Sequence, residues 1–199
     1  LEKLGVDVIE AGFPIASPGD FKAVAKISKS IRNCGVCALA RCLKPDIEAA
    51  YKATKNAKRP RLHIFLATSK IHLKYKFKKA EDEILKIALE ATRLGRKLCS
   101  DIEFSPEDAT RSERDFLYRV IEGVIKEGAR TINIPDTTGY TYPQEMYSLI
   151  DDIKNNVPNI NKAVIAVHCH DDLGMAVANS LSGVLAGARQ VHCTINGIG

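Results

Sequence analysis

The sequence predicts an α/β protein, a parallel (β/α)8 TIM barrel, from two observations. First, short apolar runs alternate with longer helical patterns along all 199 residues. Second, four segments run from a helix end through a glycine and a polar step into a strand: "KLGVDVIEAG", "RLGRKLCSDIEF", "KEGARTINIP" and "LAGARQVHCTIN". Glycine at the helix C′ position readily adopts the left-handed conformation, so these junctions indicate repeated αβ units and a parallel sheet.

Seven strands are predicted, and they start 26 to 39 residues apart. They cover residues 6–11, 36–41, 62–67, 101–105, 131–135, 163–168 and 191–196. This regular spacing favours a barrel over a doubly wound sheet.

Six amphipathic helices connect the strands, at residues 17–31, 44–57, 80–95, 112–128, 141–157 and 174–187. Their apolar residues recur at the three- and four-residue spacing of a helix face. In the first helix, Ser17 is a suitable N-cap and Pro18 occupies the first helical position.

The strand count falls one short of a complete barrel. The opening "LEKLG" is typical of a helix end whose strand lies upstream, and the chain stops in "NGIG" before another helix can follow. We therefore expect residues 1–199 to form one partial catalytic barrel domain, strands two to eight, without the first strand and last helix. An open seven-stranded sheet is the structural alternative.

Composition is ordinary for a globular protein, with 45% hydrophobic and 27% charged residues. A membrane span needs about 18 or more consecutive apolar residues, and no such run occurs. The opening "LEKLGVDVIE" lacks a signal-peptide pattern. We expect a cytoplasmic protein with no membrane partner.

The net charge of +5 has its densest part in "SKIHLKYKFKK", residues 69–79. Basic residues among aromatics can bind nucleic acid or the phosphates of a cofactor, but more often form a solvated face. No other feature supports nucleic acid, so we expect no such partner.

Six scattered cysteines indicate a reducing environment rather than a disulfide framework. "CGVC", residues 34–37, with Cys42 nearby could suggest a metal or redox site. On a strand, however, Cys37 and Cys42 point to opposite faces, so we expect buried or half-buried thiols.

Polar side chains gather at the carboxyl ends of the predicted strands, where the active sites of such barrels lie. They are Glu10, Arg41, Thr68, Ser69, Glu103, Ser105, Glu107, Asp108, Asn133, Asp136, Thr137, Thr138, His168, His170, Asp171, Asp172, His192, Thr194 and Asn196.

His168 and His170 are the strongest signal among them. Two residues apart on a strand, they project to the same side with Cα atoms about 7 Å apart. Such imidazoles can share a divalent ion at roughly 2.0–2.2 Å per bond. Two ligands do not complete a site, so a carboxylate must come from Glu10, Glu103, Glu107 or the missing first strand.

The loop "PDTTGY" offers backbone N–H groups and hydroxyls where a strand leads into a helix, a favourable place for a substrate carboxylate. A turn stabilised by Asp136 and Thr137, with Pro135 ending the strand, is an equally good interpretation.

Five motifs together resemble the 2-isopropylmalate synthases, the leucine-pathway branch of the metal-dependent Claisen-condensing barrel enzymes. They are "IEAGFP", "TSKIHLKYKFKK", "EFSPEDATRSE", "NIPDTTGY" and "HCHDDLGMAVANSLSGVLAGARQVHCTINGIG". The resemblance covers essentially the whole chain and is most specific in its last 37 residues. Related homocitrate, citramalate and methylthioalkylmalate synthases share the His-x-His strand.

The resemblance implies an acyltransferase that condenses acetyl-CoA, the co-substrate, with 3-methyl-2-oxobutanoate to give 2-isopropylmalate. A divalent metal (Zn, Mn or Mg) would polarise the 2-oxo acid, and a base would remove a proton from the acetyl methyl group. His168 and His170 would be the metal ligands, and Thr137 would hold the substrate carboxylate. Residues shaping the pocket around the isopropyl group would be Leu39, His63, Ser105, Asn133 and Pro135. Glu107 and Glu10 would act by hydrogen bonding or proton transfer.

Two metal-binding segments of that family have no counterpart here: an "RDG" strand with an Asp ligand, and an Asn that follows "GIG". Its C-terminal domains are also absent. We therefore expect this chain alone to bind metal weakly and turn over poorly, and the full-length form to be a homodimer or larger homo-oligomer.

Three alternatives stay open. The chain could come from a related 2-oxo acid synthase of homocitrate or citramalate type, or from an acyl-CoA lyase of the same superfamily. It could also be a non-catalytic barrel piece whose role is assembly.

Overall fold

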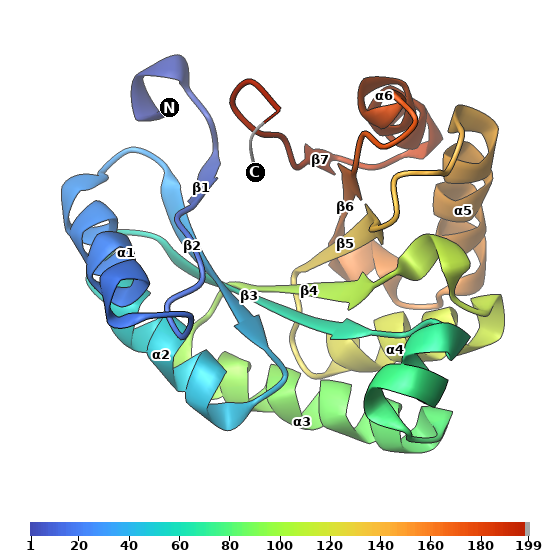
Figure 1. Cartoon of the computed structure of the whole chain (residues 1–199), viewed down its shortest axis with the longest axis horizontal. Coiled ribbons are helices and arrows are strands. Elements are labelled where there is room, and N and C mark those ends of the chain that lie inside the picture. Colours follow the sequence, from blue (N-terminus) through green and yellow to red (C-terminus); the bar gives the residue numbers. More distant parts are fainter. Residues whose placement is uncertain (198–199) are drawn as a thin grey trace.

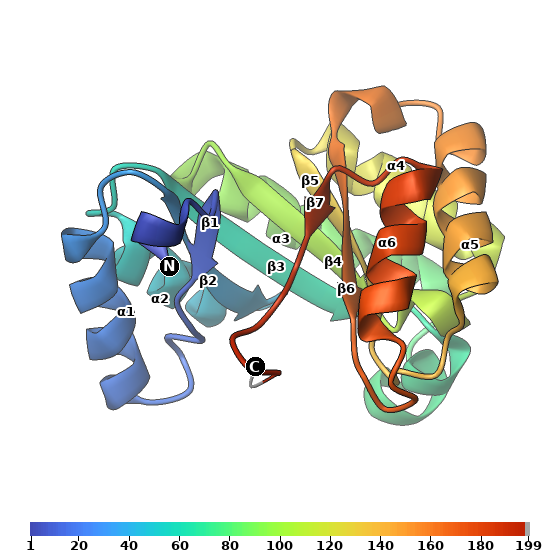
Figure 2. The same ribbon diagram turned by 90° about the horizontal axis from the view of Figure 1, so that it is seen from above.

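Seven parallel strands in sequential order form one curled sheet in the computed structural model, which describes residues 1–197. The strands are β1 Val8–Glu10, β2 Gly35–Arg41, β3 Pro60–Ala67, β4 Ile102–Glu107, β5 Thr131–Asp136, β6 Val164–Cys169 and β7 Gln190–Val191. Within the described residues, β1 and β7 are the edges, and they face each other across the curl (Figures 1 and 2). The predicted α/β fold, a partial barrel, is confirmed.

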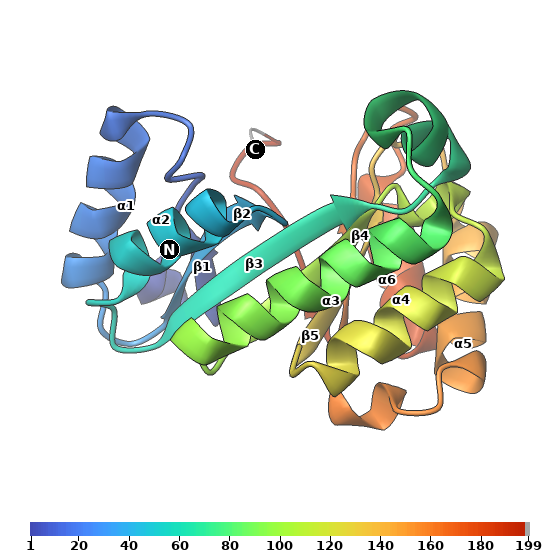
Figure 3. The same cartoon turned by 90° about the horizontal axis from the view of Figure 1, so that it is seen from below.

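The α-helices of residues 1–197 cover the convex outer face of this sheet (Figure 3). They are α1 Pro18–Ser30, α2 Lys44–Thr54, α3 Glu81–Leu98, α4 Arg114–Lys126, α5 Pro143–Asn156 and α6 Ala176–Ala186. Short helical turns occupy η1 Glu2–Leu4, η2 His72–Phe77, η3 Ala109–Arg111 and η4 Ile160–Lys162, of which η2 is a π-helix. No helix within residues 1–197 has the length and apolar character needed to cross a membrane.

Strand alternation divides the side chains between two environments. Ile64, Phe104 and Ile132 are fully buried in the apolar core beneath the helices. Their chain neighbours point the other way because successive side chains on a strand alternate. We call the concave side the inner face; it is lined by Glu10, Leu39, Arg61, His63, Glu103, Ser105, Asn133, His168 and His192. The predicted strand ends therefore converge on one surface.

The local signals at the first helix are confirmed. Ser17 has extended backbone, its Oγ accepts from the Asp20 N–H at 3.1 Å, and Pro18 begins α1. Three predicted junction glycines, Gly5, Gly128 and Gly187, have positive φ of 88°, 107° and 125°.

The fourth junction differs from the prediction. Gly95 lies inside α3, which continues to Leu98, and its role is close packing rather than helix termination. A Cβ built there would lie 2.7 Å from Ile64 Cδ1 and 3.3 Å from Ile102 Cδ1. Because glycine has no side chain, α3 can pack closely against the sheet at this position. This tertiary contact outweighs the low helix propensity of glycine.

The edge strands are shorter than predicted. β1 covers three residues and β7 only two, against the predicted 6–11 and 191–196. Each has a hydrogen-bonded neighbour on one side alone, so fewer of its residues are held in a ladder. His192 still donates its N–H to Val167 O at 2.9 Å, which extends the contact with β6 one step.

The packing of α3 predicts opposite effects for two glycine substitutions. Gly95→Ala should lower the free energy of unfolding by about 1 kcal/mol, because overpacking against fully buried Ile64 exceeds the gain in helix propensity. The control Gly123→Ala in α4 meets Leu89 Cδ2 at 2.7 Å, but Leu89 is only partly buried and can move. It should be neutral or stabilising. Urea unfolding measures both, and equal effects would contradict this packing argument.

Candidate active site

A hydrogen-bonded chain crosses the inner face from β1 to β5. Glu10 Oε2 lies 2.5 Å from His63 Nδ1, and His63 Nε2 lies 2.6 Å from Ser105 Oγ. Asn133 Nδ2 donates to the same Ser105 oxygen at 2.8 Å. His63, Ser105 and Asn133 are buried, whereas the Glu10 side chain is 40% exposed. Four residues from four strands thus form one connected polar array.

The electrostatics of this array centre on His63. Burial alone would lower the pKa of His63, but the carboxylates of Glu10 and Glu103 outweigh it and raise that pKa above its usual value. For Glu10, burial opposes ionisation, yet its contact with His63 lowers its pKa overall. Glu10 is therefore an ionised hydrogen-bond acceptor at neutral pH.

Cys37 lies beside this array. One ligand atom each from Glu10, Cys37 and His63 lie within 4.8 Å of one another, and the Cys37 Sγ–Glu10 Oε2 distance is 3.7 Å. Burial raises the pKa of the Cys37 thiol well above its usual value, so the sulfur keeps its proton. In the metal-free chain the thiol is placed to donate a hydrogen bond to the Glu10 carboxylate.

His168 and His170 face each other at the carboxyl end of β6, as predicted. Their Nε2 atoms are 3.1 Å apart and their ring centroids 5.1 Å apart. Burial, together with the imidazoles of His192 and His170, lowers the pKa of His168 to about 4. A neutral imidazole keeps a lone pair, which is the form that binds metal. Neither histidine belongs, among residues 1–197, to a group of three mutually close His, Cys, Asp or Glu ligands.

Glu103, predicted as a possible metal ligand, lies deeper. It is 2% exposed and contacts Arg61 Nη1 at 3.0 Å and His192 Nε2 at 2.7 Å. Burial would raise its pKa, but His63, His192 and Arg61 hold it at about 2. Its partners within residues 1–197 include Arg61, Gln190 and His192, so a metal shared with His168 and His170 stays a prediction for Glu103.

Arg61 and Gln190 belong to this deeper layer and were not predicted. Arg61 also donates to Asp101 at 2.9 Å and to Gln190 Oε1 at 2.8 Å. The signal available in the sequence was parity: Arg61 lies two residues before His63, and Gln190 two before His192. Residues two apart on a strand share a face.

One carboxylate, that of Asp108, holds the loop after β4 in place, and the backbone of the same residue contacts the loop after β5. Asp108, fully buried and with φ of 66°, accepts from Arg111 Nε and Nη2 at 2.8 Å each and from Ser69 Oγ at 2.5 Å. Burial opposes its ionisation, but Arg111 and Ser69 lower its pKa overall. Its N–H donates to Thr137 Oγ1 at 2.9 Å, which joins the two loops.

Each of the two interpretations of the loop "PDTTGY" applies to a different residue of that loop. Asp136 stabilises the turn, since its Oδ2 accepts from the Thr141 N–H at 3.2 Å. The Thr137 hydroxyl accepts from Asp108, so its own proton remains available to an anion. Thr137 is half-buried.

The remaining predicted residues occupy neighbouring positions. Leu39 pairs with His63 across β2 and β3, and Pro135 pairs with His168 across β5 and β6. Glu107 instead faces the basic segment: Lys76 Nζ lies 3.0 Å from both of its carboxylate oxygens. Within the described residues, Glu107 contacts neither of the two histidines.

The family model described as HMGL-like matches residues 1–199. The chain belongs to the HMGL-like family. It is 58% identical to a 2-isopropylmalate synthase of Aquifex aeolicus (strain VF5) and 57% identical to one of Pyrococcus furiosus, over all 199 residues in each case. It spans 38% and 40% of those two relatives' length.

Solved structures show the same fold. A hydroxymethylglutaryl-CoA lyase from Pseudomonas aeruginosa matches 96% of this chain and 65% of its own, with TM-score 0.73 and 23% identity. An HMG-CoA lyase from Acinetobacter baumannii, in complex with coenzyme A and 3-methylmalate, matches 94% of this chain and 62% of its own, with TM-score 0.69 and 18% identity. At these identities the likeness concerns the fold alone.

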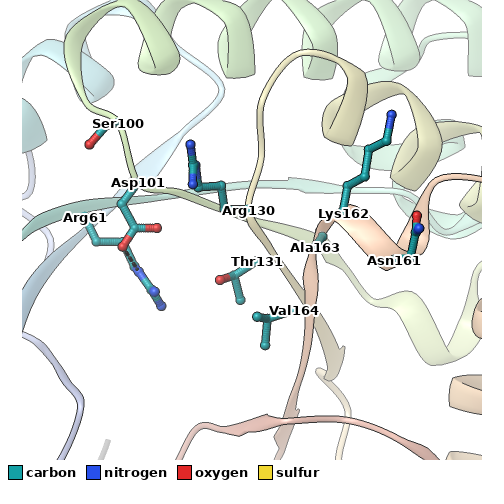
Figure 4. A pocket seen from close by; sticks show the side chains of 9 residues that line it. All are labelled: Arg61, Ser100, Asp101, Arg130, Thr131, Asn161, Lys162, Ala163 and Val164. Atoms are coloured by element: carbon teal, nitrogen blue, oxygen red, sulfur yellow. Dashed lines mark hydrogen bonds and ion pairs between the residues drawn. The ribbon is translucent and has the colours of Figure 1, made fainter.

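A separate cavity of about 600 Å³ opens at the amino ends of the strands (Figure 4). Arg61, Asp101, Thr131 and Val164 line it where β3 to β6 begin. In parallel barrels this end contributes to stability, whereas catalysis is found at the other. The candidate site is therefore the histidine end.

Asp108→Ala should lower the free energy of unfolding by about 3 kcal/mol, because it removes the partner of Arg111 and Ser69 and places alanine at positive φ. Asp108→Asn should cost less, about 1–2 kcal/mol, since asparagine tolerates this backbone and still accepts hydrogen bonds. Urea unfolding at pH 7 measures both, and wild-type stability in both would refute the loop role.

The lowered pKa of Asp108 also sets a pH dependence. Its stabilisation is present above the unfolded-state pKa of about 3.9 and is lost as pH falls through the lower folded-state pKa. Asp108→Asn should therefore lose less stability than wild type between pH 5 and pH 3. An identical loss in both would show that other carboxylates account for the acid sensitivity.

Proposed function

We propose that this chain is part of the catalytic barrel of a 2-isopropylmalate synthase, an acyltransferase that condenses acetyl-CoA with 3-methyl-2-oxobutanoate in leucine biosynthesis. Identity of 54–58% with relatives of that name over all 199 residues supports the proposal. The observation that carries it is the pair of facing Nε2 atoms of His168 and His170 at the carboxyl end of β6.

The two histidines fit a divalent cation. Ligand atoms bound at about 2.1 Å and roughly 90° to each other lie about 3 Å apart, close to the observed 3.1 Å. The low pKa of His168 supplies a neutral donor. When bound, the ion would act as a Lewis acid on the carbonyl of the oxo acid. Further ligands would come from substrate oxygens, water or groups beyond these two side chains.

The loop after β5 would bind the substrate carboxylate. The Thr137 hydroxyl is already an acceptor for the Asp108 N–H, so its proton points to another partner. A short donor hydrogen bond to a carboxylate is charge-assisted and strong.

The inner face would orient the rest of the oxo acid. Asn133 Oδ1 is buried without a hydrogen-bond partner among the described residues, and Ser105 lies beside it. Leu39 and Pro135 would supply the apolar wall next to His63 and His168. An apolar pocket discriminates a methylene by about 1–3 kcal/mol, which leaves related 2-oxo acids as the finer alternative.

Glu10 and Glu107 would handle protons by different means. Glu10 is ionised and fixes the His63 ring, which places a hydrogen-bonding group beside Ser105. Glu107, paired with Lys76, would withdraw a proton from the acetyl methyl group. Proton transfer of this kind contributes about 10²–10⁴-fold to a rate.

The proposal also covers the domain organisation, the location and the assembly of the protein. The family match over residues 1–199 supports a single catalytic barrel domain, and the six free cysteines support a cytoplasmic location. A homo-oligomer is proposed for the complete protein. The likeness to HMG-CoA lyases is restricted to the fold and does not favour lyase chemistry.

Removing either histidine of the pair should weaken metal binding and slow turnover. In a protein carrying this chain, His168→Ala and His170→Ala should each weaken Mn²⁺ binding by about 100-fold or more. Release of thiol from acetyl-CoA, dependent on 3-methyl-2-oxobutanoate, should fall in parallel. Calorimetry and a thiol assay measure these. His72→Ala, a histidine outside the pair, is the control for Mn²⁺ affinity; unchanged affinity in the two site variants would refute the metal role.

Thr137 predicts a substrate effect. Thr137→Val keeps the shape but removes the hydroxyl, so KM for the oxo acid should rise about tenfold or more, the cost of one charge-assisted hydrogen bond. Thr137→Ser should stay near wild type. Steady-state kinetics at saturating acetyl-CoA provide the measurement, and a KM unchanged by valine would exclude the proposed carboxylate contact.

A further inference from the structure

A second hydrogen-bonded chain runs from the deep layer of the inner face to the histidine pair. His168 Nδ1 lies 3.3 Å from His192 Nδ1, and His192 Nε2 lies 2.7 Å from Glu103 Oε1. The rings of His168 and His192 are nearly perpendicular, at 80°, with centroids 5.4 Å apart. His192 is thus in contact with a carboxylate on one side and with His168 on the other.

The proton positions follow from the carboxylate end. Glu103 is 2% exposed and accepts from Arg61 Nη1 at 3.0 Å and from Gln190 Nε2 at 3.1 Å. An ionised carboxylate only accepts hydrogen bonds, so His192 Nε2 must carry a proton. In neutral His192 the Nδ1 then holds a lone pair, and the proton between the two rings sits on His168 Nδ1.

Gln190 does not reverse this assignment. Its Nε2 also lies 3.0 Å from His192 Nε2, so it could donate to that atom if it were unprotonated. A lone pair on His192 Nε2 would, however, face the Glu103 oxygen at 2.7 Å. Arg61 fixes the amide by donating to Gln190 Oε1 at 2.8 Å, and the Gln190 N–H groups are then directed to Glu103.

The proton on His168 Nδ1 determines the state of the other ring nitrogen, Nε2. With its proton on Nδ1, neutral His168 has its lone pair on Nε2, the atom 3.1 Å from His170 Nε2. Metal-binding histidines commonly donate their other ring N–H to a partner that fixes tautomer and ring orientation. Here that partner is a second histidine backed by a carboxylate.

We propose that His192 and Glu103 are positioning residues that hold His168 in the tautomer whose Nε2 is free for a divalent cation. This inference rests on the proposed function for the cation, but the tautomer itself is a property of the metal-free chain. A role in holding His192 would also explain why the Glu103 carboxylate is buried, at a cost in free energy, away from the groups proposed to bind substrate.

The test compares two substitutions of His192. In a protein carrying this chain, His192→Ala removes the acceptor, and Mn²⁺ dissociation constants from calorimetry should rise about 10- to 100-fold. His192→Gln should stay near wild type, because its carbonyl can accept from His168 while its amide donates to Glu103. Cys193→Ser changes the adjacent exposed residue and serves as the matched control, also near wild type. Thermal melts verify that each variant is folded.

A second readout does not depend on metal. Long-range ¹H–¹⁵N spectra of the metal-free chain should show the proton of His168 on Nδ1 in wild type and in His192→Gln, and a shift toward the Nε2–H tautomer in His192→Ala. An Nε2–H tautomer in wild type, or wild-type Mn²⁺ affinity in folded His192→Ala, would overturn the inference. If wild type binds no Mn²⁺, the proposed metal role fails, and the tautomer alone decides the role of His192.

Discussion

The structure depends on the two-residue alternation of side chains along a curled parallel sheet. One parity supplies the apolar core under the helices, with Ile64, Phe104 and Ile132 fully buried. The other parity supplies the inner face, where burial would be costly for polar groups without partners. Each strand therefore carries core and site at once, and a register shift of one residue would exchange them.

That same parity explains how far the sequence alone could predict the site. The strand ends identified Ser105, Asn133, His168 and His170, and the family resemblance added His63. The structure brings His63, Ser105 and Asn133 into one array and the other two histidines into contact. Partners across strands were not predictable, because Glu103 meets His192 only through the three-dimensional approach of β4 to the segment after β7. Gly95 was misread for a similar reason: its contacts with Ile64 and Ile102 are tertiary, and no local pattern reports them.

Two carboxylates organise the inner face in parallel ways. Glu10 contacts His63, and that chain ends at the hydroxyl of Ser105 and the amide of Asn133. Glu103 contacts His192, and that chain ends at a ring nitrogen of His168. The first arrangement presents hydrogen-bonding groups suited to an oxygen-rich substrate, whereas the second presents a lone pair suited to a cation. The same carboxylate–histidine unit thus occurs twice on the inner face, with the ring centroids of His63 and His192 only 5.6 Å apart.

The segment that carries His192 is held in place by the side chains of Arg61, Glu103 and Gln190. His192 follows β7, an edge strand of two residues whose ladder has a partner on one side only. Backbone pairing with Val167 alone would hold this segment weakly. Arg61 adds a tether, since its contacts with Gln190, Glu103 and Asp101 join the end of the sheet to β3 and β4 by charge-assisted bonds. Side-chain charges in the interior therefore reinforce the pairing of β7 with β6, next to the segment that carries His192.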